Sequence, residues 1–227
     1  SSPDSIEEMC EQVLADHPAI DVLVNNAGRS IRRSVGLAYE RFHDYERTIQ
    51  LNYLGAVRLI LALLPAMRAN KSGHVINISS IGTQTNPPRF SAYVASKAAL
   101  DAFGRVIASE VVDDGVHITT IHMPLVRTPM IAPTRMYDVF PAISPEEAAE
   151  MIAGAMIHQP KKVATRLGTF GELLYAVAPK ASDRILNQAY KLFPDSQAAK
   201  GKTEEAPDKA PSTEAVAFAH LMKGVHW

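Results

Sequence analysis

A tyrosine and a lysine four residues apart are the side chains in this sequence whose types and spacing best suit chemistry. They stand in Tyr93-Val94-Ala95-Ser96-Lys97, inside a predicted helix over 92–113. At this separation the two side chains lie one above the other on the same helix face. A tyrosine hydroxyl has an ordinary pKa of about 10, and a neighbouring cation is expected to lower it. The pair predicts proton transfer by Tyr93 with help from Lys97, although chance alone readily produces such a pair.

Three further polar groups are expected at the same place. Ser80 directly follows one short apolar run, Asn25-Asn26-Ala27-Gly28 ends another, and Asn52 lies in a predicted long helix over 45–70. Taken singly, these are a capping serine, a turn and a polar helix residue. Ligands of open α/β sheets bind at the carboxyl ends of the strands, where Ser80 and the Asn-Asn-Ala-Gly run would both lie. Together with Tyr93 they predict one site on one rim of a sheet.

Alternating helices and strands supply the elements that must position these groups. The sequence predicts helices over 4–16, 45–70, 92–113 and 144–158, strands over 21–25, 74–79, 116–122 and 162–167, and one or two further helices over 170–193. Ser144, Pro145 and Glu147 are typical of a helix start with a capping box. The strands are uninterrupted apolar runs, which suit burial on both faces. The pattern predicts an α/β fold with a parallel sheet.

Composition excludes several classes of protein. The 227 residues are 47% hydrophobic and 21% charged with a net charge of −1, so neither wholesale disorder nor an electrostatic surface for nucleic acid is expected. A single cysteine, Cys10, excludes an internal disulfide framework, and no histidine pattern predicts a metal site. The most apolar stretch, 55–67, contains Arg58 and Pro65 and is short for a membrane span. These features predict a soluble, cytoplasmic protein.

Three regions are expected along the chain. Residues 1–194 carry the alternating elements and form the predicted domain. Residues 195–214 are rich in charge and alanine, which is typical of a polar linker. Residues 215–227 are more apolar and predict a tail that docks back on the domain or on a neighbouring subunit.

Four motifs with matching spacings resemble the short-chain dehydrogenases/reductases. The motifs are Asn25-Asn26-Ala27-Gly28, Leu51-Asn52-Tyr53-Leu54-Gly55, Ile78-Ser79-Ser80 and Tyr93-Val94-Ala95-Ser96-Lys97. The resemblance is close over 4–128 and looser to 167. It implies a Rossmann-type doubly wound parallel sheet and hydride transfer between a nicotinamide cofactor and a carbonyl or alcohol.

The resemblance also implies a role for each catalytic residue. Tyr93 would be the general acid or base, and Lys97 would lower its pKa and bind the nicotinamide ribose. Ser80 would orient and polarise the substrate oxygen, and Asn52 would hold a water molecule for a proton relay through Lys97. The same chemistry follows from the residue types, because a developing alkoxide needs preorganised donors such as two hydroxyls.

The cofactor residues that the resemblance implies include Asn25, Ala27 and Gly28 on the adenosine side. Gly28 is the first glycine in the chain, so the family's glycine-rich phosphate loop is absent from this sequence. The fold is therefore expected to lack the N-terminal strands and that loop. The residue that would choose between NAD and NADP belongs to the same absent part.

A fatty acyl reductase subfamily is the best match in the later part of the chain. In Met123-Pro124-Leu125-Val126-Arg127-Thr128 the family's usual glycine is replaced, while Val126 and Thr128 remain to contact the carboxamide. This variant resembles the reductase domain of bacterial multidomain fatty acyl-CoA reductases and their mycolate-reductase relatives. The other segments that resemble them are 129–134, 192–196 and 224–227. The subfamily favours NADP(H) over NAD(H) and an acyl-chain carbonyl as substrate.

The expected partners are therefore a nicotinamide cofactor, an acyl-chain small molecule and a second copy of the chain. The family commonly forms homodimers or homotetramers through the helices over 45–70 and 92–113, whose apolar residues permit this. No nucleic acid and no transmembrane segment are expected. Two alternatives stay open: a 3-oxoacyl-carrier-protein or small-alcohol dehydrogenase/reductase, and a non-catalytic dimerisation fragment.

Overall fold

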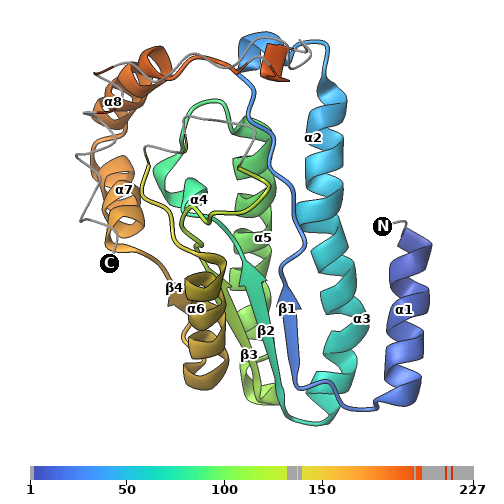
Figure 1. Ribbon diagram of the computed structural model, residues 1–227. Helices are drawn as coiled ribbons and strands as arrows, with labels where there is room; N and C mark the ends of the chain where they lie inside the picture. The colour runs from blue at the N-terminus through green and yellow to red at the C-terminus, as the bar shows by residue number, and fades with distance from the viewer. Residues whose placement is uncertain are drawn as a thin grey trace.

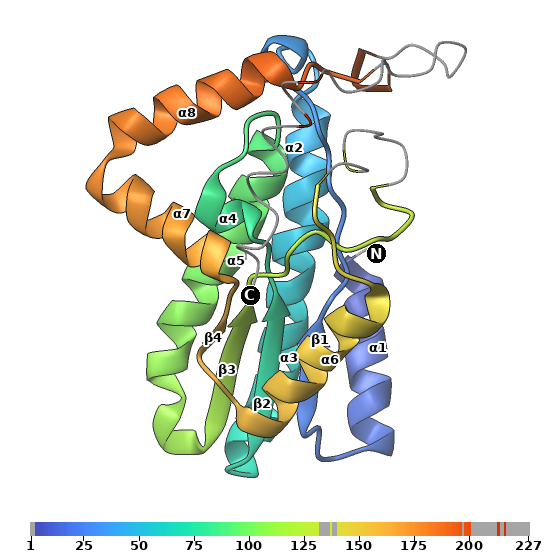
Figure 2. The same ribbon diagram turned by 60° about the vertical axis from the view of Figure 1, so that its left-hand side comes forward.

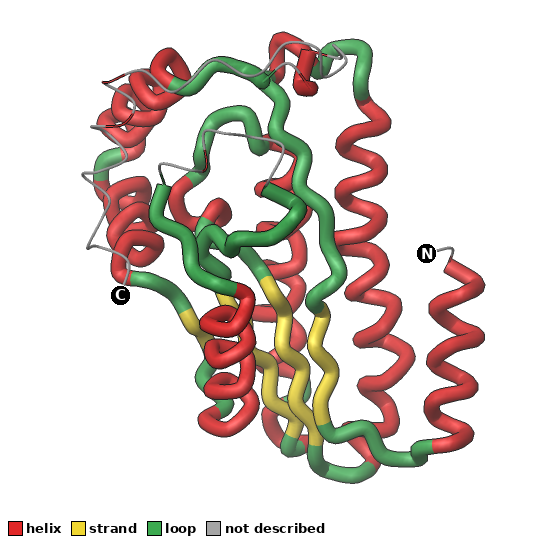
Figure 3. Tube along the Cα trace, viewed as in Figure 1, coloured by secondary structure: helices red, strands yellow, loops and turns green. Residues whose placement is uncertain are grey.

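A four-stranded parallel sheet forms the centre of the computed structural model, which describes residues 3–131, 137, 140–196, 198–200, 213 and 216. The strands are β1 (Val22–Asn25), β2 (Gly73–Ile78), β3 (Val116–Ile121) and β4 (Lys162–Val163), in the order β1-β2-β3-β4 (Figures 1 and 3). Asn25 is opposite Asn77, so β1 and β2 end at nearly the same level. The α/β class and the parallel sheet are confirmed. In the described residues β1 pairs on one side only, with β2.

Helices cover both faces of this sheet. They are α1 (Pro3–Asp16), α2 (Phe42–Ile49), α3 (Gly55–Ala69), α4 (Gly82–Thr85), α5 (Ser91–Glu110), α6 (Pro145–His158), α7 (Arg166–Val177) and α8 (Pro179–Leu192). Val75 of β2 packs with Ile60 of α3 and Ile107 of α5. Ile76 packs in a second cluster, which includes Ala155 of α6. Figure 2 shows α6 lying against the sheet on the face opposite α3 and α5. Because neighbouring strand residues face opposite sides, both faces of the strand need apolar residues.

One helical run extends from Phe42 to Ala69 through a π-helical turn, Gln50–Leu54. The run is longer than the apolar stretch considered from sequence, and by length and composition alone it qualifies as a membrane-crossing helix. In this run 28% of the apolar window is buried, and Ile60 and Met67 are fully buried against the sheet. The π turn is the part that matters for the site, because it holds Asn52.

The starts of α6 and α7 follow from their capping residues. Ser144 Oγ accepts from Glu147 N at 3.1 Å, and Glu147 Oε2 accepts from Ser144 N at 2.7 Å, which confirms the predicted capping box. The strand expected over 162–167 is wrong in length, since β4 ends at Val163. Thr165 Oγ1 accepts from Gly168 N at 3.1 Å and starts α7 there. A residue that caps a helix has left the strand ladder.

The described start of the expected linker packs on the domain. Asp195 accepts a hydrogen bond from Ser34 N at 3.0 Å, and Ser196 is buried. Apart from 195–196, 198–200, 213 and 216, the expected linker and docking tail lie outside the described residues.

Candidate active site

Ser80 lies where β2 leaves the sheet, as its position after an apolar run predicts. Ser79 N donates to Ile121 O at 2.8 Å, and Ile81 N donates to Met123 O at 2.9 Å, so the extensions of β2 and β3 stay side by side. Ser80 Oγ accepts from Gly82 N at 3.0 Å at the start of α4. These backbone bonds hold the Ser80 hydroxyl at the carboxyl edge of the sheet.

Helix α5 brings Tyr93 and Lys97 to the same edge. The Ser80 side chain is near enough to the Tyr93 hydroxyl to act on it as a hydrogen-bonding neighbour, which lowers the Tyr93 pKa. Lys97 is only 4% exposed, and its Nζ donates to Ile78 O at 2.6 Å. The spacing of four residues therefore places both groups beside the end of β2, as the helical pattern predicts.

The Gly28 turn joins this group from β1. A Cβ atom on Gly28 would lie 3.3 Å from Lys97 Nζ and 3.3 Å from Asn52 Oδ1, so the backbone approaches both side chains closely. Asn52 Oδ1 accepts from Arg29 N at 2.8 Å, and its Nδ2 donates to Arg29 O and to Ser96 Oγ, both at 2.9 Å. The structure thus gives the Asn52 side chain a positioning contact that fixes the turn after Gly28. Its role in holding a relay water stays a prediction.

A cavity of about 660 Å³ opens beside these groups. The sequence-predicted residues that line it are Gly28, Ser80, Tyr93, Lys97, Val126 and Thr128. Much of the remaining wall is apolar and includes Met123, Leu125, Ile131, Ile152, Leu167, Ile185, Leu186 and Phe193. The volume is typical of a site for a small molecule or cofactor.

Two of the expected cofactor residues do not line this cavity. Asn25 is buried, and its Nδ2 donates to Asn77 Oδ1 at 2.9 Å, so it joins β1 to β2. Ala27 is exposed next to Gly28, and Asn26 lines the cavity instead. The adenosine contacts implied for Asn25 and Ala27 stay predictions.

The pKa of Tyr93 differs from the sequence expectation. Burial raises this pKa, the hydrogen bond with Ser80 lowers it, and the negative charge of Asp101 raises it. Burial has the largest effect, so the expectation of a net lowering is wrong for this state of the protein. The Tyr93 phenol is protonated at neutral pH and can donate a proton.

Lys97 shows the opposite shift. Burial lowers its pKa from an ordinary 10.5 to about 8, and the nearby Asp101 carboxylate opposes the change. Desolvation disfavours a charged ammonium, whereas a neighbouring negative charge favours it. Lys97 is therefore still mostly cationic at pH 7, with its charge sensitive to Asp101.

A buried polar chain behind Ser80 was not identified from the sequence. Thr83 Oγ1 donates to Ser80 O at 2.9 Å and lies 3.0 Å from His122 Nδ1, which is 3.8 Å from Asp101 Oδ2. Burial lowers the pKa of His122, so its ring is neutral at pH 7. The Thr83 hydroxyl has one proton, which it donates to Ser80 O. We therefore assign His122 Nδ1 as the donor in the hydrogen bond between His122 and Thr83 Oγ1. No sequence motif links these three side chains, since they come from α4, α5 and the end of β3.

Tyr137 is a second phenol that the sequence analysis did not single out. It lines the cavity, and burial raises its pKa to about 12. Within the described ranges, no three or more His, Cys, Asp or Glu side chains are grouped to hold a metal ion.

The residues present fit the nicotinamide end of a dinucleotide cofactor. Gly28 leaves space beside Lys97 that any side chain would fill. Ser79 lines the cavity, and its buried Oγ has no hydrogen-bond partner in the described part of the chain. A buried hydroxyl without a partner is costly unless a ligand satisfies it.

Similarity to known proteins identifies the class to which this chain belongs. The family model described as short chain dehydrogenase matches residues 1–137, and the chain belongs to this family of oxidoreductases. A crystal structure of a short-chain dehydrogenase from Streptomyces avermitilis shares the fold, with a TM-score of 0.68 and 28% identity over 83% of this chain and 77% of that one. A short-chain dehydrogenase from Burkholderia cenocepacia, solved in complex with NADP, has a TM-score of 0.70 at 21% identity, with coverages of 82% and 74%.

Particular relatives are closer in sequence. A fatty acyl-CoA reductase of Acinetobacter baylyi is 51% identical over 223 residues, which are 98% of this chain and 74% of the relative. An uncharacterized oxidoreductase of Mycobacterium bovis is 48% identical over all 227 residues, and the chain spans 67% of its length. A fatty acyl-CoA reductase of Mycobacterium tuberculosis is 44% identical over 189 residues, 83% of this chain and 64% of that protein.

Proposed function

We propose that this chain forms the catalytic part of an NADPH-dependent reductase for acyl-chain carbonyls: a fatty aldehyde, an acyl thioester or a 3-oxoacyl group. One observation carries the proposal. Ser80, Tyr93 and Lys97 open onto a cavity of about 660 Å³ whose further wall is mostly apolar. The similarity to the Acinetobacter baylyi fatty acyl-CoA reductase supports the same substrate class.

The two hydroxyls are the groups that would act on the substrate oxygen. A carbonyl placed between Ser80 and Tyr93 would accept hydrogen bonds from both, and these bonds strengthen as negative charge develops on the oxygen. A reduced nicotinamide, when bound, supplies a hydride to the carbonyl carbon. Tyr93 then transfers its hydroxyl proton to the oxygen, so an aldehyde gains one hydride and one proton and becomes an alcohol. For a thioester, hydride addition to the carbonyl carbon would be followed by cleavage of the C–S bond, which leaves an aldehyde, and the proton would end on the sulfur of the released thiol.

Lys97 would stabilise the tyrosinate that remains after proton transfer. Its pKa of about 8 keeps it mostly cationic at neutral pH while allowing proton exchange near the working range. Positioned proton transfer of this kind contributes on the order of 10²–10⁴ in rate. Asn52 would support the reaction indirectly by fixing the turn that carries Gly28.

The cofactor would contact Gly28, Tyr93, Lys97, Val126 and Thr128. NADP(H) is proposed over NAD(H) because of the resemblance to fatty acyl-CoA reductases. We also propose a cytoplasmic location and a homodimer or homotetramer. Leu61 of α3 and Val106 of α5, which are 58% and 59% exposed, support assembly through these two helices.

Fluorescence titration with NADPH and then with NADH tests cofactor use, and a panel of short and long aldehydes and acyl thioesters tests the substrate. We expect saturable binding that is tighter for NADPH, and turnover that increases with chain length. Preference for short-chain substrates, or for a 3-oxoacyl group carried on a carrier protein, would instead favour the alternative small-alcohol or 3-oxoacyl-carrier-protein enzyme. Failure of both cofactors to bind would favour the non-catalytic alternative, and sedimentation would report the assembly.

A further inference from the structure

Helix α8 lies beyond the carboxyl end of the sheet (Figure 2), and it contributes residues to the wall of the cavity. Its residues Ile185, Leu186 and Ala189, and Phe193 just after it, line the cavity. Phe193 also packs against Phe140, with ring centroids 5.3 Å apart. An acyl chain whose carbonyl lies at Ser80 would meet this apolar wall as it lengthens.

A buried arginine attaches this wall to the loop before α5. Arg89 has a side chain only 5% exposed, and its Nε lies 3.2 Å from Asp195 Oδ1. Its Nη1 donates to Tyr190 O at 3.0 Å, and the guanidinium carbon lies 3.9 Å from the centre of the Tyr190 ring. Asp195 Oδ1 also accepts from Ser34 N at 3.0 Å. One arginine thus contacts both α8 and the segment that follows it.

Two more arginines hold the segment after α8. Arg32 Nη2 donates to Phe193 O at 3.0 Å and to Pro194 O at 2.9 Å. The Arg33 guanidinium donates to Ala199 O. Both come from the loop that continues from the Gly28 turn, so the wall and the catalytic edge are connected through one short stretch of chain.

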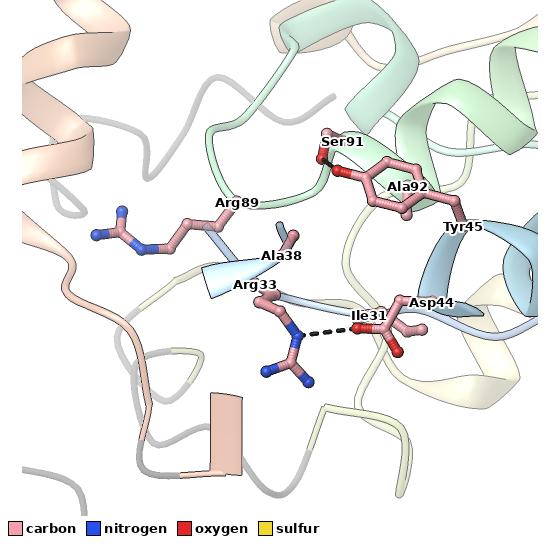
Figure 4. Close-up of a pocket in the computed structure, with 8 residues that line it drawn as sticks. All are labelled: Ile31, Arg33, Ala38, Asp44, Tyr45, Arg89, Ser91 and Ala92. Atoms are coloured by element: carbon pink, nitrogen blue, oxygen red, sulfur yellow. Dashed lines mark hydrogen bonds and ion pairs between the residues drawn. The ribbon is translucent and has the colours of Figure 1, made fainter. Parts of the chain in front are cut away.

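The backbone at Arg89 is itself constrained. Its φ is +75°, in the left-handed region that residues other than glycine adopt infrequently. Arg89 O accepts from Arg33 N at 2.7 Å, and Arg33 Nε pairs with Asp44 at 2.9 Å. Figure 4 shows the Arg33–Asp44 pair and the Arg89 side chain extending away from it. Such conformations persist where the surrounding contacts determine them, often at ligand sites.

We infer that α8 is the wall that sets the length of acyl chain the cavity accepts, and that the Arg89–Asp195 ion pair fixes the position of this wall. The inference rests on the proposed acyl substrate class. A buried ion pair is a weak source of stability, yet its geometry specifies one arrangement of the parts that it joins. Ala189 is the smallest residue on the cavity side of α8 and is 9% exposed, so it marks where added bulk would shorten the cavity.

Binding of straight-chain alcohols from C4 to C16 to the full chain, followed by calorimetry, tests this inference without cofactor or turnover. In Ala189→Phe the longest alcohols should bind at least tenfold more weakly while the shortest bind as in the wild type. Each buried methylene is worth about fourfold in affinity, so excluding two of them suffices. Ala181→Phe is the matched control, because Ala181 is exposed on the same helix and does not line the cavity.

Two further variants keep the test decisive. Ile185→Phe changes a cavity residue that is 48% exposed, so this variant should fold even if Ala189→Phe does not. It should also selectively weaken the binding of long alcohols. Asp195→Asn keeps the hydrogen bond from Ser34 N but removes the ionic contact with Arg89. It should weaken the binding of long alcohols about fivefold and have little effect on the binding of short ones. Unchanged length profiles in folded Ala189→Phe and Ile185→Phe, or no binding of any alcohol to the wild type, would overturn the inference.

The inference and the proposed function fail separately. If alcohol binding depends on chain length as expected but the protein has no reductase activity, the role of α8 as the wall stands and the proposed reductase function is refuted. Reductase activity with the same length preference in wild type and variants would refute the wall and retain the reductase.

Discussion

Replacing Lys97 with methionine should stabilise the chain at neutral pH and destabilise it in alkali. Lys97 is 4% exposed, and burial lowers its pKa from 10.5 to about 8. At about 1.4 kcal/mol per pH unit, this lowering corresponds to about 3 kcal/mol of destabilisation by the buried ammonium. Methionine keeps the apolar stem but loses the bond to Ile78 O, which is worth about 1 kcal/mol. The variant should therefore be about 2 kcal/mol more stable at pH 7.

The pH dependence of folding stability separately tests the direction of the effect of Lys97→Met. Between pH 8 and 10.5 the unfolded wild type binds more protons at Lys97 than the folded protein, so wild-type stability rises with pH in this window. The advantage of the methionine variant should shrink there and become a deficit of about 1 kcal/mol near pH 10.5.

Thermal melting of the wild type and of Lys97→Met at pH 7 and pH 10 measures both effects. A gain of about 2 kcal/mol corresponds to a melting temperature about 4–8 °C higher for a chain of this size. Lys161→Met, which replaces an exposed lysine, is the control for the substitution itself. A Lys97→Met variant no more stable than the wild type at pH 7, or one whose difference is the same at both pH values, would refute the reasoning.

Three other variants test separate parts of the site and fold. Asp101→Asn removes the charge that raises the pKa of Lys97, so the alkaline limb of the pH–rate profile should move to lower pH. If this limb does not move, the Asp101 charge does not control the reaction. Gly28→Ala places a Cβ 3.3 Å from Lys97 Nζ. This variant should lower turnover about tenfold while leaving the melting temperature nearly unchanged, because displacements of this size disturb a catalytic geometry more than a core. Ser144→Ala removes the capping hydroxyl of α6 and should cost about 1 kcal/mol in chemical denaturation; an unchanged midpoint would mean that the bond to Glu147 N contributes nothing.

The parts of the fold that sequence predicts well are those with local signals. The capping box at Ser144 lies within four residues, and the Tyr93–Lys97 face follows from helix geometry. The strand predicted over 162–167 is too long because Thr165, which fits a strand by propensity, acts as the cap of α7. The π turn at Gln50–Leu54 has no recognised sequence signal here, yet it orients Asn52.

The parts of the site that sequence does not predict depend on long-range contact. Arg89 and Asp195 are far apart in the chain, and neither lies in a motif that points to the other. The direction of the Tyr93 pKa shift depends on burial, which the spacing of Tyr93 and Lys97 does not report. His122 and Asp101 meet only because β3 ends beside α5.

In the proposed reaction Tyr93 supplies the proton for carbonyl reduction. The most direct measurement compares wild type and Tyr93→Phe for NADPH consumption and alcohol formation with a long-chain aldehyde, after both are shown to bind NADPH and to melt alike. The variant should lose turnover by a factor on the order of 10²–10⁴ while cofactor binding is retained. Turnover close to that of the wild type would contradict it.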